Sequence, residues 1–151
     1  MLNYSREQLV DLGAEITTRE IHQQPQVWQA AFDAYRAHQT EIEAFIDSID
    51  GKHGYVKVIF TGAGTSAYVG DTLIPYLRSI YDERKWNFNS VATTDIVANP
   101  LTHLRKDVPT VLVSFARSGN SPESVATVDL AKQLVDELYQ VTITCAAEGK
   151  L

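Results

Sequence analysis

Residues 110–121 read TVLVSFARSGNS, and residues 56–66 read VKVIFTGAGTS. Each stretch begins as a short apolar run rich in β-branched residues and passes directly into a turn of small residues. Such runs are typical of strands that are buried on both faces of a sheet. Helix-like sequence follows both turns. Each stretch therefore predicts a strand, a tight turn and a helix N-terminus in succession.

The two turns have the composition of anion-binding loops. Backbone N–H groups at a helix start have no partner inside the helix, and the helix dipole favours negative charge there. Glycine lets a ligand approach the main chain closely, and Ser66, Ser118 and Ser121 add hydroxyl donors. Two such turns predict a site for a phosphorylated small molecule.

From Tyr55 onward the chain alternates between strand and helix patterns. We expect a polar edge strand over 87–93, a loop with one helical turn over 95–104 and a helix over 121–138, with the other strands over 56–60, 109–115 and 140–146 and another helix over 65–81. This order predicts an α/β fold with a doubly wound parallel sheet and right-handed crossovers. Ligands of such sheets bind at the carboxyl ends of the strands.

The N-terminal part of the chain reads as helical. Ser5 can cap a first helix, with Gln8 at the capping-box position. Pro25 is expected to interrupt the helical pattern. A second helix is therefore predicted over 25–49, with Gly51 just past its end. The change of pattern suggests two parts, an N-terminal helical segment of residues 1–52 and a domain of residues 53–151.

Composition excludes several classes of function. A net charge of -6 and a pI near 5.1 argue against nucleic acid as a partner. No stretch approaches the roughly 20 apolar residues of a membrane span, and the N-terminus lacks a signal-peptide core. The single cysteine, Cys145, is expected to be a buried, inert thiol of a cytoplasmic protein. No cysteine and histidine spacing resembles a zinc site, so we expect no metal ion and no cofactor.

The first turn differs from two common nucleotide-binding loops. It lacks the lysine of a P-loop. It also has Ala67 where a dinucleotide fingerprint most often has its third glycine. An ordinary strand–helix turn with a capping serine stays open for each turn. Arg117 could pair with a phosphate or lie along the surface.

The two turns resemble those of the sugar isomerase (SIS) domain family, which binds phosphosugars. Residues 62–66 (GAGTS) match the family's first phosphate turn, and residues 116–121 (ARSGNS) match its second. Ala116 departs from the pattern, because many members have serine there. The segments 19–28 and 114–124 together look closest to the tagatose-6-phosphate ketose/aldose isomerase branch, which is also described as galactosamine-6-phosphate deaminase/isomerase.

The resemblance implies a flavodoxin-like domain whose last strand would follow Leu151, in a protein with two SIS domains and more than twice this length. The chain then looks like an N-terminal fragment with an incomplete first SIS domain. The implied chemistry is proton transfer between C1 and C2 of an opened sugar phosphate, coupled to loss of ammonia for an amino sugar. A homo-oligomer is expected. Neither the carboxylate base nor the ring-opening histidine can be placed within these residues.

The expected phosphosugar contacts all belong to the two turns: Gly64, Thr65, Ser66, Ser118, Gly119, Asn120 and Ser121. His103 could reach a ligand from its loop, whereas the other three histidines are expected at the surface. Asp95 could contact the sugar but is favoured as a helix cap, and Glu123 as a dipole partner. Two alternatives to the enzyme stay open: a phosphosugar-sensing module of a regulator, and an interaction protein with vestigial turns.

Overall fold

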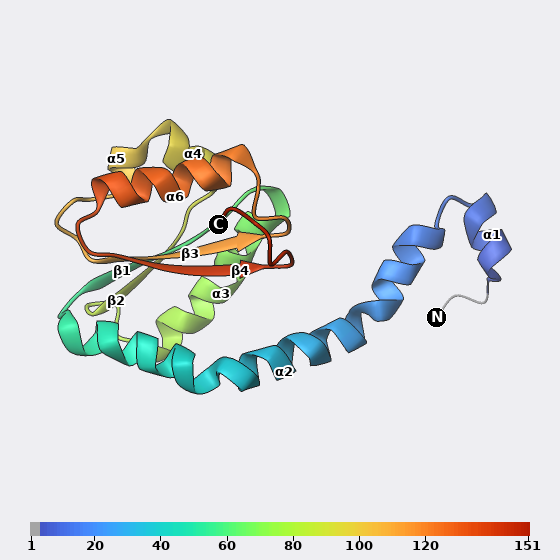
Figure 1. Cartoon of the computed structure of the whole chain (residues 1–151), viewed down its shortest axis with the longest axis horizontal. Coiled ribbons are helices and arrows are strands. Elements are labelled where there is room, and N and C mark those ends of the chain that lie inside the picture. Colours follow the sequence, from blue (N-terminus) through green and yellow to red (C-terminus); the bar gives the residue numbers. More distant parts are fainter. Residues whose placement is uncertain (1–3) are drawn as a thin grey trace. The chain divides into compact units, whose positions relative to one another are not determined.

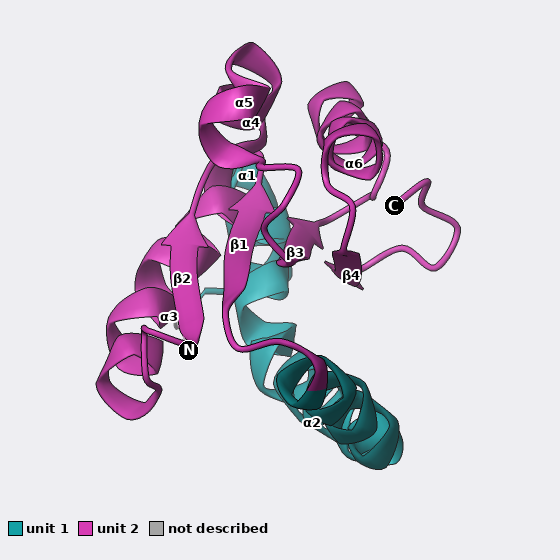
Figure 2. Ribbon diagram, turned by 90° about the vertical axis from the view of Figure 1, so that its left-hand side faces the viewer, with its two compact units in different colours: residues 1–51 teal, residues 52–151 magenta. Residues whose placement is uncertain are grey.

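A computed structural model describes residues 4–151 of the chain. The chain divides into two compact units at residue 51, so the described part of the first unit is 4–51 and the second unit is 52–151 (Figure 2). The first unit is helical and the second is built around a sheet (Figure 1). Among the described residues, no helix combines the length and the apolar character that crossing a membrane requires.

Helix α1 (Arg6–Asp11) begins as the sequence predicts and ends at a glycine. The Ser5 side chain accepts the backbone N–H of Gln8, and the Gln8 side chain accepts the N–H of Ser5, which confirms the capping box. Gly13 has a φ of +66°, and the N–H of Ala14 reaches back to the carbonyl of Leu9 at 2.8 Å. This is a Schellman ending, and it places the break between the helices at Gly13.

The predicted break at Pro25 is therefore wrong. Helix α2 (Glu15–Lys52) runs for 38 residues with Pro25 inside it and passes through Gly51 as well. Proline removes one backbone hydrogen bond, but the surrounding turns are rich in glutamine, alanine and glutamate, which favour helix. Pairs one turn apart, such as Gln29 with Asp33 and Gln39 with Glu43, add support along its exposed surface.

The second unit contains a sheet of four parallel strands in the order β2-β1-β3-β4, as the alternating pattern predicts. The strands are β1 (Val56–Gly62), β2 (Trp86–Ser90), β3 (Thr110–Ala116) and β4 (Leu138–Thr144). The two most apolar strands, β1 and β3, are central and pair with each other. The more polar β2 lies at an edge, as expected.

Helices cover both faces of this sheet (Figures 1 and 2). Helix α3 (Ala67–Ile80) lies on one face, and α4 (Thr93–Ala98), α5 (Pro100–His103) and α6 (Pro122–Leu134) lie on the other. The core under α4 and α6 is apolar and almost fully buried: Ile59, Ile96, Leu104, Leu112, Val128, Ala131 and Val135. The doubly wound arrangement is thus confirmed.

Several element boundaries differ from the prediction, among them that of the edge strand, which ends at Ser90 instead of residue 93. The segment 95–104 holds two short helices, α4 and α5, instead of a loop with one turn. Helix α6 ends at Leu134, because Val135 adopts an extended conformation and turns into the core at 6% exposure. The next strand consequently begins at Leu138, where the prediction still had helix.

The predicted burial of Cys145 is also wrong, since its side chain is exposed. The residue follows β4, which has only β3 as a neighbour within the described chain and leaves Ile143 53% exposed. An apolar run in an edge strand does not ensure burial. His53 is expected at the surface but is half-buried, and its Nε2 lies 2.8 Å from the Tyr139 hydroxyl.

Helix α3 packs on the sheet through a glycine. A Cβ added at Gly70 would lie 2.6 Å from Ser90 Oγ and 2.7 Å from Phe60 Cβ. Phe60 is itself fixed by ring contacts with Phe88 and Phe115, at 6.3 and 6.1 Å between centroids. The backbone of α3 can approach β1 and β2 this closely only because position 70 has no side chain.

Gly70→Ala should therefore destabilise the chain by about 1–3 kcal/mol, since an added methyl must displace packed atoms. Gly51→Ala is the matched control, because it is also a helical glycine but its Cβ would meet nothing within 4 Å. Denaturant unfolding should give an unchanged or slightly higher free energy for this control. Equal effects of the two variants would contradict the packing assigned to α3.

A surface ion pair predicts a pH dependence. Lys52 Nζ donates to Glu137 Oε2 at 2.6 Å, and this hydrogen bond holds the pKa of the Glu137 carboxyl below its usual range. A carboxyl with a depressed pKa in the folded state stabilises the protein above its unfolded pKa, and that contribution is lost as pH falls through the folded pKa. Lys52→Gln should thus lower stability slightly at pH 7 and not at pH 2, as measured by denaturant unfolding.

Candidate functional site

The two glycine turns lie side by side at the carboxyl edge of the sheet. The register of β1 with β3 pairs Thr61 with Ser114 and Gly62 with Phe115, so the two strands end level. Gly64 in the first turn and Gly119 in the second have φ values of +57° and +66°, which glycine adopts without strain. Each turn then leads into a helix, the 3₁₀ turn η1 (Gly64–Ser66) with α3 and the helix α6.

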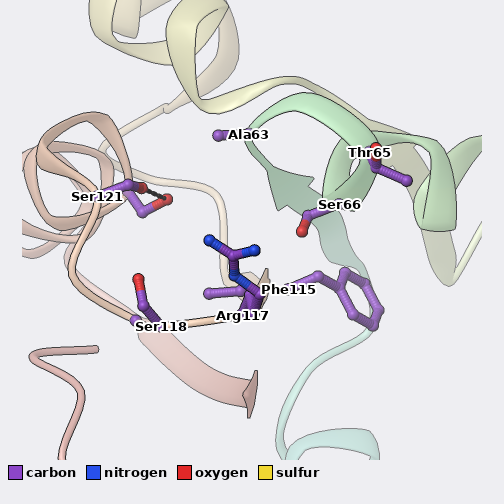
Figure 3. Close-up of a pocket in the computed structure, with 10 residues that line it drawn as sticks. Ala63, Thr65, Ser66, Phe115, Arg117, Ser118 and Ser121 are labelled. Atoms are coloured by element: carbon purple, nitrogen blue, oxygen red, sulfur yellow. Dashed lines mark hydrogen bonds between the residues drawn. The ribbon is translucent and has the colours of Figure 1, made fainter. Parts of the chain in front are cut away.

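A cavity of about 310 Å³ lies between the turns (Figure 3). This size falls at the lower end of the range found for small-molecule sites, roughly 300–1,000 Å³. Its lining combines hydroxyl groups, one guanidinium group and a few apolar side chains: Ala63, Thr65, Ser66, Phe115, Ala116, Arg117, Ser118, Gly119, Ser121 and Ser124.

The first turn contributes two hydroxyl groups. Ser66 occupies the N-cap position of α3, but its side chain accepts no capping hydrogen bond. Ser66 is half-buried and Thr65 is exposed, and both line the cavity. The reading of Ser66 as a plain capping residue is therefore wrong, and its hydroxyl is available to a ligand.

The second turn contributes two more, and a third comes from Ser124 in helix α6. Ser118 is exposed, and its Oγ accepts the N–H of Asn120 at 3.3 Å. Ser121 is at the N-cap position of α6, yet its side chain makes no capping bond and lies 2.7 Å from Ser124 Oγ instead. Ser118 and Ser121 face Ser66 from the other side of the cavity (Figure 3).

Arg117 supplies the positive charge of the site. Figure 3 shows its guanidinium group between Ser66 on one side and Ser118 and Ser121 on the other. Within residues 4–151, no carboxylate lies at ion-pair distance from this side chain. An unpaired guanidinium beside several hydroxyl donors is suited to a phosphate, which it can bind through two parallel hydrogen bonds.

Two of the residues expected at the site do not line the cavity, Gly64 and Asn120. Gly64 shapes the backbone of its turn. The Asn120 side chain is engaged elsewhere, because its Oδ1 accepts the N–H of Lys150 at 3.2 Å. The same N–H reaches the Gly119 carbonyl at 3.1 Å, so the segment after β4 is held against the second turn.

The cavity lining contains no histidine and no carboxylate. His103 is half-buried at the end of α5, where its carbonyl accepts Lys57 Nζ at 2.6 Å. Asp95 is exposed in the first turn of α4 and does not cap that helix, whose N-cap is Ala92. Glu123 lies in the first turn of α6, outside the lining. Among the described residues, no group of three potential metal ligands comes together.

Sequence reasoning missed Ser124, which is only 4% exposed and lines the cavity. Its position three residues after Ser121 on the helix face that packs on the sheet is the signal that could have found it. Ala116, the departure from the SIS pattern, also lines the cavity and brings no hydroxyl group there.

Comparisons with known proteins show which enzymes the chain resembles. D-galactosamine-6-phosphate deaminase AgaS of Shewanella sp. (strain ANA-3) is 44% identical over 147 residues, which are 97% of this chain and 38% of the relative. The crystal structure of tagatose-6-phosphate ketose/aldose isomerase from Escherichia coli is 43% identical with a TM-score of 0.81, over 88% of this chain and 35% of that one. The chain is homologous to these proteins.

A candidate tagatose-6-phosphate ketose/aldose isomerase from Clostridium novyi matches over 98% of the chain and 37% of its own, with a TM-score of 0.88 and 41% identity. The four-stranded sheet and its helices therefore have the SIS fold of these isomerase structures. The chain spans a little over a third of the length of these relatives. No protein-family model matches it.

The position of Arg117 gives a direct prediction. Arg117→Gln should weaken binding of inorganic phosphate about tenfold, because a charge-assisted hydrogen bond contributes more than a neutral one. Arg105→Gln makes the same change in net charge outside the cavity lining, so calorimetric titration should show little change for this control. Equal losses in both variants would mean that Arg117 acts only through the overall charge.

Proposed function

We propose that the chain forms the phosphosugar-binding unit of a ketose/aldose isomerase or an amino-sugar-phosphate deaminase that acts on tagatose 6-phosphate or galactosamine 6-phosphate. One observation carries the proposal: the hydroxyl groups of both glycine turns and the Arg117 guanidinium line a single cavity that contains no acid or base. Such a lining can hold a phosphate but cannot move a proton.

Phosphate is the ligand group that this set of donors favours. Ser66, Ser118 and Ser121 can each donate one hydroxyl hydrogen bond. The first turn of α6 adds the positive end of a helix dipole, and Arg117 adds a full charge. A phosphate monoester has three terminal oxygens to accept these hydrogen bonds, and the cavity leaves room for the first carbons of a sugar.

The identity of the sugar is supported by the relatives. One group of relatives is named for a deaminase of D-galactosamine 6-phosphate, and the solved structures are named for an isomerase of tagatose 6-phosphate. Both sugars carry their phosphate at C6, so one phosphate cradle serves either of them. The relatives are named as enzymes, so they give no support to a regulatory module.

The chemistry proposed for the whole protein is a proton transfer between C1 and C2 of the opened sugar. For an amino sugar, the isomerised imine is hydrolysed, so that one water is consumed and ammonia leaves. Both reactions need a general base and a ring-opening acid. Since the cavity lining offers neither, we infer that these groups reach the ligand from outside this lining, from further chain or from a second copy in a cytoplasmic homo-oligomer. The 151-residue chain alone should bind without turnover.

The double variant Ser66→Ala with Ser118→Ala tests the proposal. It removes one hydroxyl donor from each turn and should weaken binding of D-galactosamine 6-phosphate at least tenfold, because phosphate accepts charge-assisted hydrogen bonds. Calorimetry measures the affinity, and circular dichroism checks that the variant stays folded.

The matched control is Ser48→Ala with Ser79→Ala. Both serines are exposed on helices, and their hydroxyls bond only to nearby backbone carbonyls, of Phe45 and Tyr76. This control should bind as the wild type does. Unchanged affinity in a folded Ser66 and Ser118 double variant would refute the phosphate site.

A further inference from the structure

The hydroxyl groups of Ser121 and Ser124 form a pair at the start of α6. Their oxygens lie 2.7 Å apart, and the dashed line at Ser121 in Figure 3 marks this hydrogen bond. Ser124 is 4% exposed, whereas Ser121 is half-buried and closer to solvent. Both side chains line the cavity. One member of the pair is therefore held in the wall of the site, and the other faces the space where a ligand would lie.

This pair does not serve the helix as a cap. The Ser121 carbonyl accepts the N–H groups of Ser124 and Val125, each at 3.1 Å, so the backbone itself closes the first turn of α6. The usual N-cap bond, from the Ser124 N–H to the Ser121 side chain, is not made. The hydroxyl–hydroxyl bond thus has no evident task in holding the helix start together.

We propose that Ser124 is a positioning residue, whose hydroxyl orients that of Ser121 toward the ligand's phosphate. The inference rests on the proposed function and adds a residue that does not itself need to touch the ligand. In the structure Ser121 donates to Ser124. With phosphate bound, both hydroxyl hydrogens rotate: Ser121 donates to a phosphate oxygen, and Ser124 donates to Ser121. No covalent bond forms or breaks.

The chemistry of a hydroxyl explains why this relay strengthens binding. A serine hydroxyl has one hydrogen to donate and two lone pairs that accept. When Ser121 gives its hydrogen to phosphate, its lone pairs are free to accept from Ser124, which keeps the rotamer fixed. Hydrogen bonds in a chain polarise one another in a site of low dielectric, so the bond to phosphate becomes stronger.

Thr127, one turn further along α6, shows the contrasting arrangement. Its hydroxyl is fully buried and bonds to the backbone carbonyls of Glu123 at 2.8 Å and Thr93 at 3.3 Å. It has no partner in the cavity lining. Thr127 therefore supports the packing of α4 and α6, and it offers a control for loss of a buried hydroxyl from the same helix face.

The test is a double-mutant cycle on the 151-residue chain. Affinities for D-galactosamine 6-phosphate and for inorganic phosphate are measured by calorimetry for the wild type, Ser121→Ala, Ser124→Ala and the combined variant. Ser121→Ala should weaken both ligands about tenfold, and Ser124→Ala about fivefold, because each loses part of one charge-assisted bond. The combined variant should bind no more weakly than Ser121→Ala, since Ser124 acts through Ser121.

Two further variants separate positioning from folding. Ser124→Thr keeps the hydroxyl and should restore the wild-type affinity. Thr127→Val should lower the free energy of unfolding and leave both affinities unchanged.

The outcomes distinguish this inference from the function on which it rests. The positioning role alone would be overturned if the affinity losses of the two single variants multiply in the combined variant. It would also be overturned if Ser124→Ala binds with wild-type affinity while Ser121→Ala binds more weakly. A wild-type chain that binds neither ligand would overturn the phosphate site and the positioning role together.

Discussion

The pairing of β1 with β3 determines where every group at the cavity lies. These strands are the centre of the sheet, and their side chains Ile59 and Leu112 are 0% and 1% exposed. A slip of one residue would turn each strand's side chains to the opposite face, and the apolar core resists this. Because the strands are parallel and end level, both turns meet at one edge. The spacing between the two glycine turns is thus set by burial in the core and not by the turns themselves.

The features of the fold that could be predicted from sequence have strong local causes. The β-branched runs of β1 and β3, the small-residue turns and the capping box at Ser5 each depend on neighbouring residues only. The errors arose where two local signals compete or tertiary packing decides. Pro25 predicts a break, but Gly13 supplies the positive φ that ends α1, and α2 continues through Pro25. The end of α6 depends on the burial of Val135, which no local pattern reveals.

In the candidate site, too, features with local causes could be predicted from sequence and features that depend on tertiary contacts could not. Both turns were predicted because glycine and serine at a strand end are visible in the sequence. The residue type of Asn120 predicts a ligand contact, but its side chain accepts the N–H of Lys150, 30 residues later, and this contact exists only in the folded chain. Sequence reasoning misses Ser124 for the converse reason, since its contact with Ser121 across one helical turn exists only in the folded chain. Residue type predicts which groups can bind, whereas the fold decides which of them are already occupied.

The contact between the second turn and the segment after β4 has an evolutionary consequence. A Cβ at Gly119 would lie 3.1 Å from Gly149 Cα, and a Cβ at Gly149 would lie 2.9 Å from the carbonyl oxygen of Ser118. Neither position can gain a side chain unless the other main chain moves away. These two glycines, which are far apart in the sequence, should therefore be retained together. Any lineage that keeps the ARSGNS turn in this shape should keep both.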